Sequence, residues 1–85
     1  MNKTIPLSEL KPGEIAVIVK VKGDREIRRR ILDMGVVTGV EIKVVRKAPL
    51  GDPVELFVKN YHLTLRKKEA SQIYVNKIGG EKNEG

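Results

Sequence analysis

The side chains that could do chemistry in this 85-residue sequence are few and lie far apart. His62 is the only histidine, and there is no cysteine. Zinc and similar metals are usually held by several imidazole and thiolate ligands, so a site here would depend on one imidazole and scattered carboxylates. We therefore expect His62 to be an exposed strand residue, and we expect neither a metal site nor a bound cofactor.

The serines and carboxylates also lack the partners that catalysis requires. A serine nucleophile needs a neighbouring base, and neither Ser8 nor Ser71 has one nearby in the sequence. Asp52 and Glu55 stand on either side of Pro53, where Asp52 is suited to a hydrogen bond within its own loop. No glycine-rich phosphate-binding loop is present. The sequence therefore predicts a protein that is not an enzyme.

The overall charge is the strongest compositional signal. The chain has 17 lysines and arginines against 11 aspartates and glutamates, which gives a formal net charge of +6. Such a balance favours an acidic partner, whether nucleic acid, anionic lipid or an acidic protein surface. A solvated basic surface that aids solubility would have the same composition. Charge alone does not decide between these readings.

Three consecutive arginines, Arg28, Arg29 and Arg30, are the sharpest charged feature. They could contact an acidic partner, or one of them could be offered to a nucleotide-binding site on another protein. The alternative is a solvated helix face, because Glu26–Arg30 and Arg29–Asp33 have the i,i+4 spacing of helical ion pairs. The stem of Arg28 is expected to pack beside the apolar side of the helix.

Hydrophobic periodicity predicts a mainly β fold with one short helix inserted after the first strand. Asp24 is placed to cap the start of this helix, and Gly35 to end it in a left-handed conformation. Several short antiparallel strands in so small a chain favour a closed, SH3-like barrel, which removes exposed sheet edges. The expected strands are residues 14–22, 40–47, 54–58, 61–65 and 73–77, with a helical turn at 67–72.

The expected domain covers residues 1–78, and residues 79–85 are glycine-rich and polar enough to predict a disordered tail. No stretch approaches the roughly 18 apolar residues of a membrane helix. The N-terminus has no long apolar region typical of an export signal. Together with the absence of cysteine, these features predict a cytoplasmic protein.

Alternation along each strand also predicts which side chains face the core. In the first strand we expect Ile15, Val17, Val19 and Val21 to point inward. The expected inward residues of the last three strands are Val54, Leu56 and Val58, then Tyr61, Leu63 and Leu65, then Ile73 and Val75. Lys59–Asn60 should form a two-residue hairpin loop. Some apolar residues fall on outward positions, where they could form a docking patch or be covered by the helix or a terminal segment. These outward residues are Ile18, Val45, Phe57 and Tyr74.

The segment 48–53 holds two prolines and one glycine, so we expect a stiff loop. Leu50 lies at its centre beside Asp52. Because a stiff loop loses little conformational entropy on docking, Leu50 could anchor an interface. The alternative is that Leu50 folds back and plugs the end of the barrel. The candidate partner-binding residues are thus Arg28, Arg29, Arg30, Leu50, Asp52, Phe57 and Tyr74.

Five motifs follow one another along the chain, at residues 7–14, 30–39, 48–54, 63–70 and 73–75. In this order and spacing they resemble the FeoA-like family over about residues 5–78. This family comprises small cytosolic proteins of bacterial ferrous iron uptake. The resemblance implies an SH3-like barrel that acts as an accessory or regulatory protein. It also implies a partner, the membrane permease for ferrous iron, which has a cytosolic GTP-binding domain, and we expect the protein to meet the membrane only through this partner.

The rival interpretation is a basic small barrel that binds nucleic acid. Proteins that bind single strands stack the bases on aromatic side chains, and the only aromatic residues here are Phe57, Tyr61 and Tyr74. We therefore favour the accessory protein of iron transport, and expect any nucleic-acid binding to be weak, driven by phosphate charge and sensitive to salt.

Overall fold

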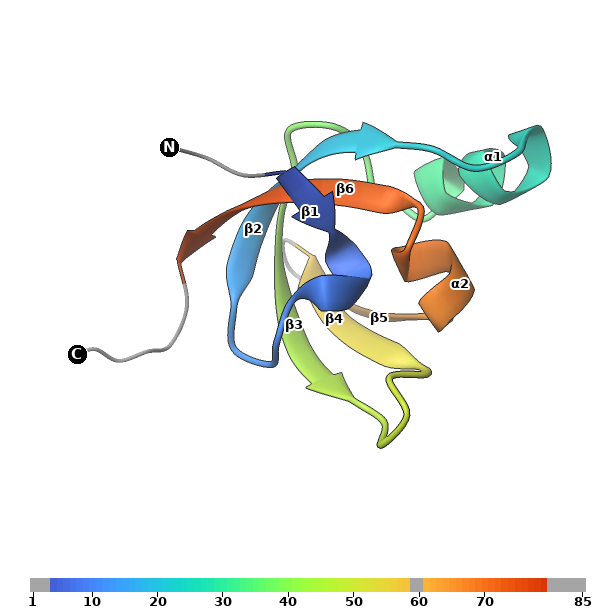
Figure 1. Ribbon diagram of the computed structural model, residues 1–85. Helices are drawn as coiled ribbons and strands as arrows, with labels where there is room; N and C mark the ends of the chain where they lie inside the picture. The colour runs from blue at the N-terminus through green and yellow to red at the C-terminus, as the bar shows by residue number, and fades with distance from the viewer. Residues whose placement is uncertain (1–3, 59–60, 80–85) are drawn as a thin grey trace.

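The computed structural model describes residues 4–58 and 61–79, which form one curled antiparallel sheet of six strands in the order β1-β6-β2-β3-β4-β5 (Figure 1). This confirms the predicted fold class, with one strand more than expected. The strands are β1 (Thr4–Pro6), β2 (Ile15–Val21), β3 (Glu41–Lys47), β4 (Val54–Val58), β5 (Tyr61–Leu65) and β6 (Ile73–Gly79); the helices are α1 (Arg25–Asp33), α2 (Lys67–Ala70) and the single 3-10 turn η1 (Leu7–Glu9).

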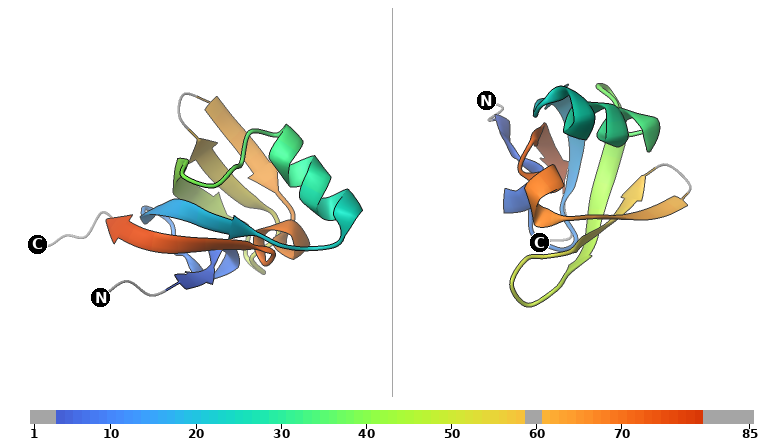
Figure 2. Two further views of the ribbon diagram at one scale, coloured as in Figure 1. Left: turned by 90° about the horizontal axis from the view of Figure 1, so that it is seen from above. Right: turned by 90° about the vertical axis from the view of Figure 1, so that its right-hand side faces the viewer.

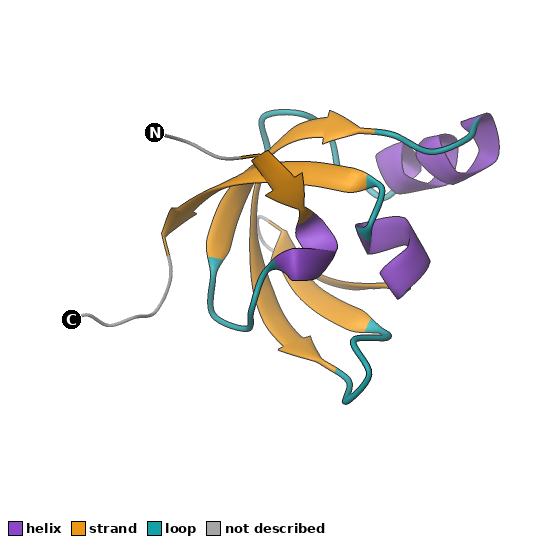
Figure 3. Ribbon diagram, in the orientation of Figure 1, coloured by secondary structure: helices purple, strands orange, loops and turns teal. Residues whose placement is uncertain are grey.

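The unpredicted strand, β1, pairs with β6 at one edge of the sheet. Its three residues are too few to show an alternating pattern, and Pro6 cannot donate a ladder hydrogen bond, which suits an edge position. β1 and β5 are the two edges of the sheet. Between them η1 contacts β6 and α2, and α2 contacts β5 (Figure 3). Within the described residues, short helices therefore close the barrel in place of strand pairing.

The core is aliphatic and is contributed mainly by strands. The expected inward residues of β4, Val54, Leu56 and Val58, are fully buried, as are Ile73 and Val75 of β6. Since every second residue of a strand faces the same side, alternation correctly predicted which of these side chains face the core. The remaining fully buried side chains in the described residues are Leu7, Leu10, Ala16, Ile18, Ile31, Val36, Val44, Leu65 and Ala70, with Ile42 at 1% exposure.

The first strand contradicts its predicted orientation. Ala16 and Ile18 are fully buried, whereas Ile15, Val17 and Val19 are only half-buried. The pairing of β2 with β6 shifts register between Ile18 and Lys20, as at a β-bulge, and an extra residue reverses the direction of the side chains that follow. Both faces of this strand carry apolar residues, so alternation alone does not show which face points to the core.

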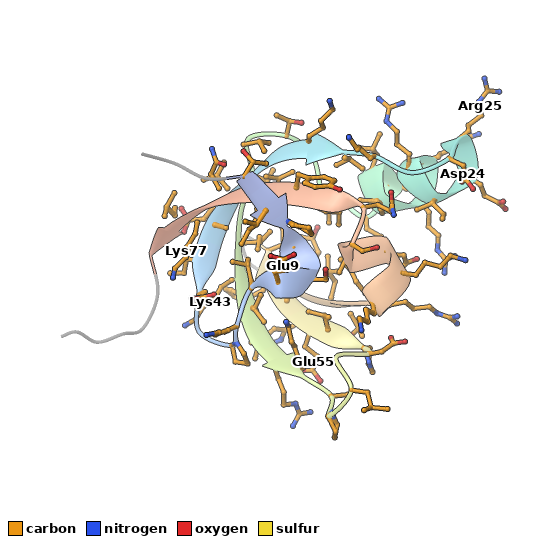
Figure 4. The ribbon with its side chains drawn as sticks, viewed as in Figure 1. Glu9, Asp24, Arg25, Lys43, Glu55 and Lys77 are labelled. Carbon is orange, nitrogen blue, oxygen red and sulfur yellow. The ribbon has the colours of Figure 1, made fainter. Side chains whose placement is uncertain are left out.

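The helix α1 begins and ends as predicted (Figure 4, where Asp24 and Arg25 are labelled). The Asp24 side chain accepts a hydrogen bond from the Ile27 N–H at 2.9 Å. At the other end Gly35 has φ +88°, which suits glycine because it has no β-carbon. Ile31 is fully buried, and Ile27 and Met34 pack against the core. Its apolar stripe therefore holds α1 on the barrel.

The remaining predicted elements agree with the structure except at their ends. Tyr61 begins β5 but is 41% exposed, and its hydroxyl donates to the Met34 carbonyl at the end of α1. The predicted turn at 67–72 is present as the shorter helix α2. β6 extends to Gly79, one residue into the predicted tail. The expected hairpin loop Lys59–Asn60 and tail residues 80–85 lie outside the described residues.

Candidate docking surface

A row of paired residues crosses the outer face of the barrel. Ile15 in β2 pairs with Lys43 in β3, Lys43 with Phe57 in β4, and Phe57 with His62 in β5. Because directly paired residues point to the same side of a sheet, these four side chains form a continuous strip. Lys43 is labelled on this face in Figure 4.

Two shallow hollows of about 460 and 490 Å³ lie on either side of this strip. Lys43 and Phe57 line both hollows and so form the ridge between them. The first is also lined by Pro12, Gly13, Val44, Val45 and His62, and the second by Ile15, Thr38, Gly39, Val40 and Glu41. We call the strip and its two hollows the outer-face groove.

Phe57 is the central apolar group of the outer-face groove. It is 38% exposed, and its ring lies 4.9 Å from the His62 ring, edge to face at 61°. Val45, on the same side of the strip, is 40% exposed. Partly exposed apolar groups backed by a rigid sheet can bury further area against a partner without reordering. The groove can therefore dock a protein segment.

The predicted apolar patch is only partly present. Val45 and Phe57 belong to the outer-face groove, but the expectation that Ile18 faces solvent is wrong, because Ile18 is fully buried beside the bulge. Tyr74 pairs with Lys20 and Pro6 at the other end of the sheet. There the Lys22 ammonium lies 5.3 Å from the centre of the Tyr74 ring, a favourable cation–π arrangement. Tyr74 is thus outside the groove.

The three arginines lie on α1, away from the groove. Arg30 makes an ion pair with Glu69 of α2 at 3.4 Å. The predicted helical pairs of Glu26 and Asp33 with arginines are not formed in the part of the chain that the structure describes. Arg28 and Arg29 are exposed on the same helix. Arg30 is therefore bound by a residue of another helix, and helical spacing could not predict this pair.

Leu50 and Asp52 lie on the β3–β4 loop, at the opposite end of the barrel from α1 (Figure 2, right). Leu50 is 85% exposed, so the alternative that it plugs the barrel is wrong. Asp52 does not cap its own loop; its Oδ1 accepts a hydrogen bond from the Lys67 N–H at 3.1 Å. The seven candidate residues thus occupy four separate places: the groove, α1, the loop and the Tyr74 end of β6.

His62 lies in the groove and is exposed. Within residues 4–58 and 61–79, no three histidine, aspartate or glutamate side chains are placed to hold a metal ion. None of the helices in these ranges is long and apolar enough to span a bilayer. The expectations that the protein binds no metal and no cofactor remain predictions.

The Glu14 carboxylate, near the groove, is held by a backbone N–H and by a lysine. The Lys11 N–H donates to Glu14 Oε1 at 2.7 Å, and the Lys77 ammonium lies 2.6 Å from Oε2. The Lys11 N–H, and after it Lys77, stabilise the ionised form and lower the pKa of Glu14 below its usual 4.5. This pair joins β6 to the turn before β2, and so supports one side of the groove.

Sequence reasoning missed Lys43 and the turn Pro12–Gly13 as parts of this surface. Alternation does place Lys43 on the outer face of its strand. However, only the pairing of β3 with both β2 and β4 sets Lys43 between Ile15 and Phe57. Strand partners come from distant segments of the chain, so the sequence of a single strand does not predict its pairing register.

Comparisons with known proteins agree with this fold. Residues 5–77 match the FeoA domain family. The chain is 49% identical over 72 residues to the Fe(2+) transport protein A/Fe(2+) transporter FeoB fusion protein of Porphyromonas gingivalis. That match covers 85% of this chain but only 8% of the fusion protein.

Two solved structures are similar over most of their length. A FeoA-like protein from Clostridium acetobutylicum is 37% identical with a TM-score of 0.87, covering 99% of this chain and 98% of that one. FeoA of Stenotrophomonas maltophilia, solved in complex with zinc and described as a prokaryotic SH3 domain protein, is 33% identical with a TM-score of 0.71, covering 88% of each chain. The SH3-like topology is therefore shared with close relatives.

Proposed function

This chain belongs to the FeoA family of accessory proteins of ferrous iron transport, and on that basis we propose that it is a non-enzymatic regulatory protein that binds the membrane iron permease. The supporting observation is the Porphyromonas gingivalis relative, in which a matching segment is fused with an Fe(2+) transporter. A fusion holds two domains at a high effective concentration. A separate chain would need a docking surface of its own to achieve the same proximity.

The outer-face groove is the best candidate for that docking surface. Phe57 and Val45 present apolar area on a rigid sheet, and Lys43 and His62 add polar groups beside them. Interface hot spots typically combine a central aromatic group with a polar rim. The cytosolic GTP-binding domain of the permease is the proposed partner. Arg28, Arg29, Arg30 and Tyr74 remain candidate contacts outside the groove.

Nucleic acid is a weaker candidate because the aromatic side chains do not form a stacking platform. Phe57 contacts His62, the Tyr61 hydroxyl bonds to α1, and Lys22 lies over the Tyr74 ring. Phe57 and Tyr61 belong to successive residue pairs of β4 and β5 and so point to opposite sides of the sheet, while Tyr74 lies on β6. A protein partner therefore fits the described surface better than single-stranded nucleic acid does.

The proposal is tested by binding the purified protein to the detergent-solubilised permease, with and without guanine nucleotide. We expect a saturable complex, with Phe57→Ala weakening the affinity about tenfold or more if the ring is a hot spot. Ile78→Ala is the matched control, because it removes an exposed apolar group that lines neither hollow of the groove and is not among the candidate residues. Melting curves of both variants check that each remains folded.

Absence of binding in every nucleotide state would contradict the proposed function. Binding that survives in Phe57→Ala but is lost when Arg28, Arg29 or Arg30 is changed would move the interface to α1. In that case a single arginine whose loss abolishes stimulated GTP hydrolysis would favour an arginine offered to the nucleotide.

A further inference from the structure

The β3–β4 loop, residues 48–53, projects from the barrel as a compact turn (Figure 1). The Gly51 N–H donates to the Ala48 carbonyl at 2.7 Å, and the Ala48 N–H donates to the Pro53 carbonyl at 3.1 Å. These bonds hold the turn in one shape. Leu50, at its tip, is 85% exposed, the largest value among the exposed large apolar side chains of the described residues.

The loop is also held against the helix α2. Besides the hydrogen bond from Lys67 N–H to Asp52, a β-carbon added to Gly51 would lie 3.9 Å from Lys67 Cδ. The stem of the Lys67 side chain therefore runs beside the turn. Since Arg66 and Lys68 are its chain neighbours, a basic segment flanks the apolar tip.

The positive charges around this tip are mostly not neutralised. Lys47 Nζ donates to the Ser8 carbonyl at 2.7 Å, which carries no net charge. Arg66, Lys67 and Lys68 are exposed and make no ion pair within the described residues. We call Leu50 and the four cations Lys47, Arg66, Lys67 and Lys68 the basic tip.

Three of the nearby acidic groups are engaged. Glu55, labelled in Figure 4, pairs with Arg46 at 3.0 Å. Glu69 is 7% exposed, accepts from the Arg66 N–H and pairs with Arg30. Asp52 accepts from the Lys67 N–H but adds one negative charge to the tip. The exposed Glu9, next to Ser8 in η1, adds a second negative charge near Lys47, so four cations against two such carboxylates leave a local excess of two positive charges.

We propose that the basic tip binds the surface of an anionic phospholipid membrane, with Leu50 inserted among the headgroups and the four cations next to lipid phosphates. Amphipathic helices bind membrane surfaces through buried apolar area together with basic side chains that attract anionic lipids, and the basic tip presents both kinds of group. Each lysine or arginine near an anionic leaflet adds to the attraction, which falls off within the screening length.

Other partners fit the basic tip less well. The hollow beside the loop is lined by residues 46–49, 53 and 55, and Leu50 is not part of its lining. Leucine is also under-represented among protein hot spots. The loop has no aromatic side chain on which a base could stack. An aliphatic side chain that inserts among lipid headgroups needs neither an adjoining hollow nor an aromatic ring.

The test is flotation of the purified protein with vesicles that contain no permease. Vesicles of equimolar phosphatidylglycerol and phosphatidylcholine should bind the protein, and vesicles of phosphatidylcholine alone should not. Binding should fall steeply as salt is raised. Leu50→Ala should weaken the partition about tenfold, as expected for removing most of an inserted leucine. Each of Lys67→Gln and Lys68→Gln should weaken it about fivefold.

Two control variants match these changes elsewhere on the surface. Ile78→Ala removes an aliphatic group that is 54% exposed on β6, far from the loop, and Arg29→Gln removes an exposed charge on α1. Both should bind vesicles as the unchanged protein does. Because Leu50 contributes little to the fold, its variant should keep the melting temperature, so a lost partition reports on the contact itself.

Three results would overturn the proposal: equal binding to neutral vesicles, an unchanged partition of Leu50→Ala, or the same loss in the two control variants. Weaker binding of Leu50→Ala to the detergent-solubilised permease would instead assign the tip to that protein. A DNA oligonucleotide bound more tightly than the anionic vesicles would assign it to nucleic acid. Since the vesicles contain no permease, failure here is separate from failure of the proposed function.

Discussion

The helix α1 and the β3–β4 loop project from opposite ends of the barrel (Figure 2). Exposed cations lie on α1 and beside the loop on α2. The helix and the loop differ in what lies beneath. α1 is capped at both ends and buries Ile31 fully, whereas Leu50 of the loop is 85% exposed. Exposed charge therefore does not show whether an element stabilises the fold or binds a partner. The burial of its apolar side chains does. Changes in α1 should lower stability, and changes in the loop should alter binding alone.

The largest expected effect is that of Ile31→Ala in the apolar stripe of α1. Removing a fully buried isoleucine leaves a cavity and should lower the free energy of unfolding by about 3 kcal/mol. Urea denaturation measures this directly. A loss no larger than that of Leu50→Ala would break the contrast between the two regions, because it would mean that α1 is not held by its buried stripe.

The next effect is expected at the end of α1. Gly35→Val places a β-branched residue at φ +88°, where a new β-carbon would also overlap the Tyr61 hydroxyl, so we expect a loss of about 2 kcal/mol or more. Gly35→Ala combined with Tyr61→Phe removes the overlapping oxygen. The double variant should therefore be less destabilised than the sum of the single changes. Strict additivity would mean that the hydroxyl does not restrict this position.

At the start of α1, Asp24→Ala removes the side chain that accepts from the Ile27 N–H. Loss of such a cap should cost about 1 kcal/mol. Asp24→Asn keeps a capping oxygen and should restore most of this stability, with the melting temperature as the readout. If alanine were tolerated as well as asparagine, the cap would not contribute to holding α1.

Acid should lower the free energy of unfolding of the whole domain, because the responsible group, Glu14, lies in neither α1 nor the loop. The pKa of Glu14 is lowered in the folded state, so its stabilising effect is fully present above its unfolded pKa and is lost as pH falls through the lower folded value. Unfolding free energies measured from neutral pH down through pH 4.5 and below should therefore decline. Glu14→Gln should flatten this decline, and Lys77→Gln should flatten part of it.

The smallest expected effect on stability is that of Leu50→Ala, within about 0.5 kcal/mol of zero. Because the side chain is already in solvent, its truncation removes almost no buried area. Differential scanning calorimetry should give a nearly unchanged melting temperature. A loss approaching that of Ile31→Ala would show that Leu50 packs against the barrel in solution, and the distinction between the loop and α1 would fail.

Local patterns were enough to predict much of the molecule. Strict alternation predicted the inward faces of β4 and β6, and the capping residues Asp24 and Gly35 predicted the limits of α1. The series of motifs indicated the FeoA family, which the comparisons confirmed. These properties depend on neighbours in the chain, so they are legible from residue types and spacing.

The tertiary structure decided what depends on distant segments. It buried Ile18 beside a bulge, joined Arg30 to Glu69 rather than to Glu26, and placed Phe57 in the groove without Leu50. The sequence by itself determined the class of fold and the identity of the exposed groups. Only strand pairing and the packing of α1 and α2 decided which of those groups share a surface, because the register between remote strands is set by the whole core.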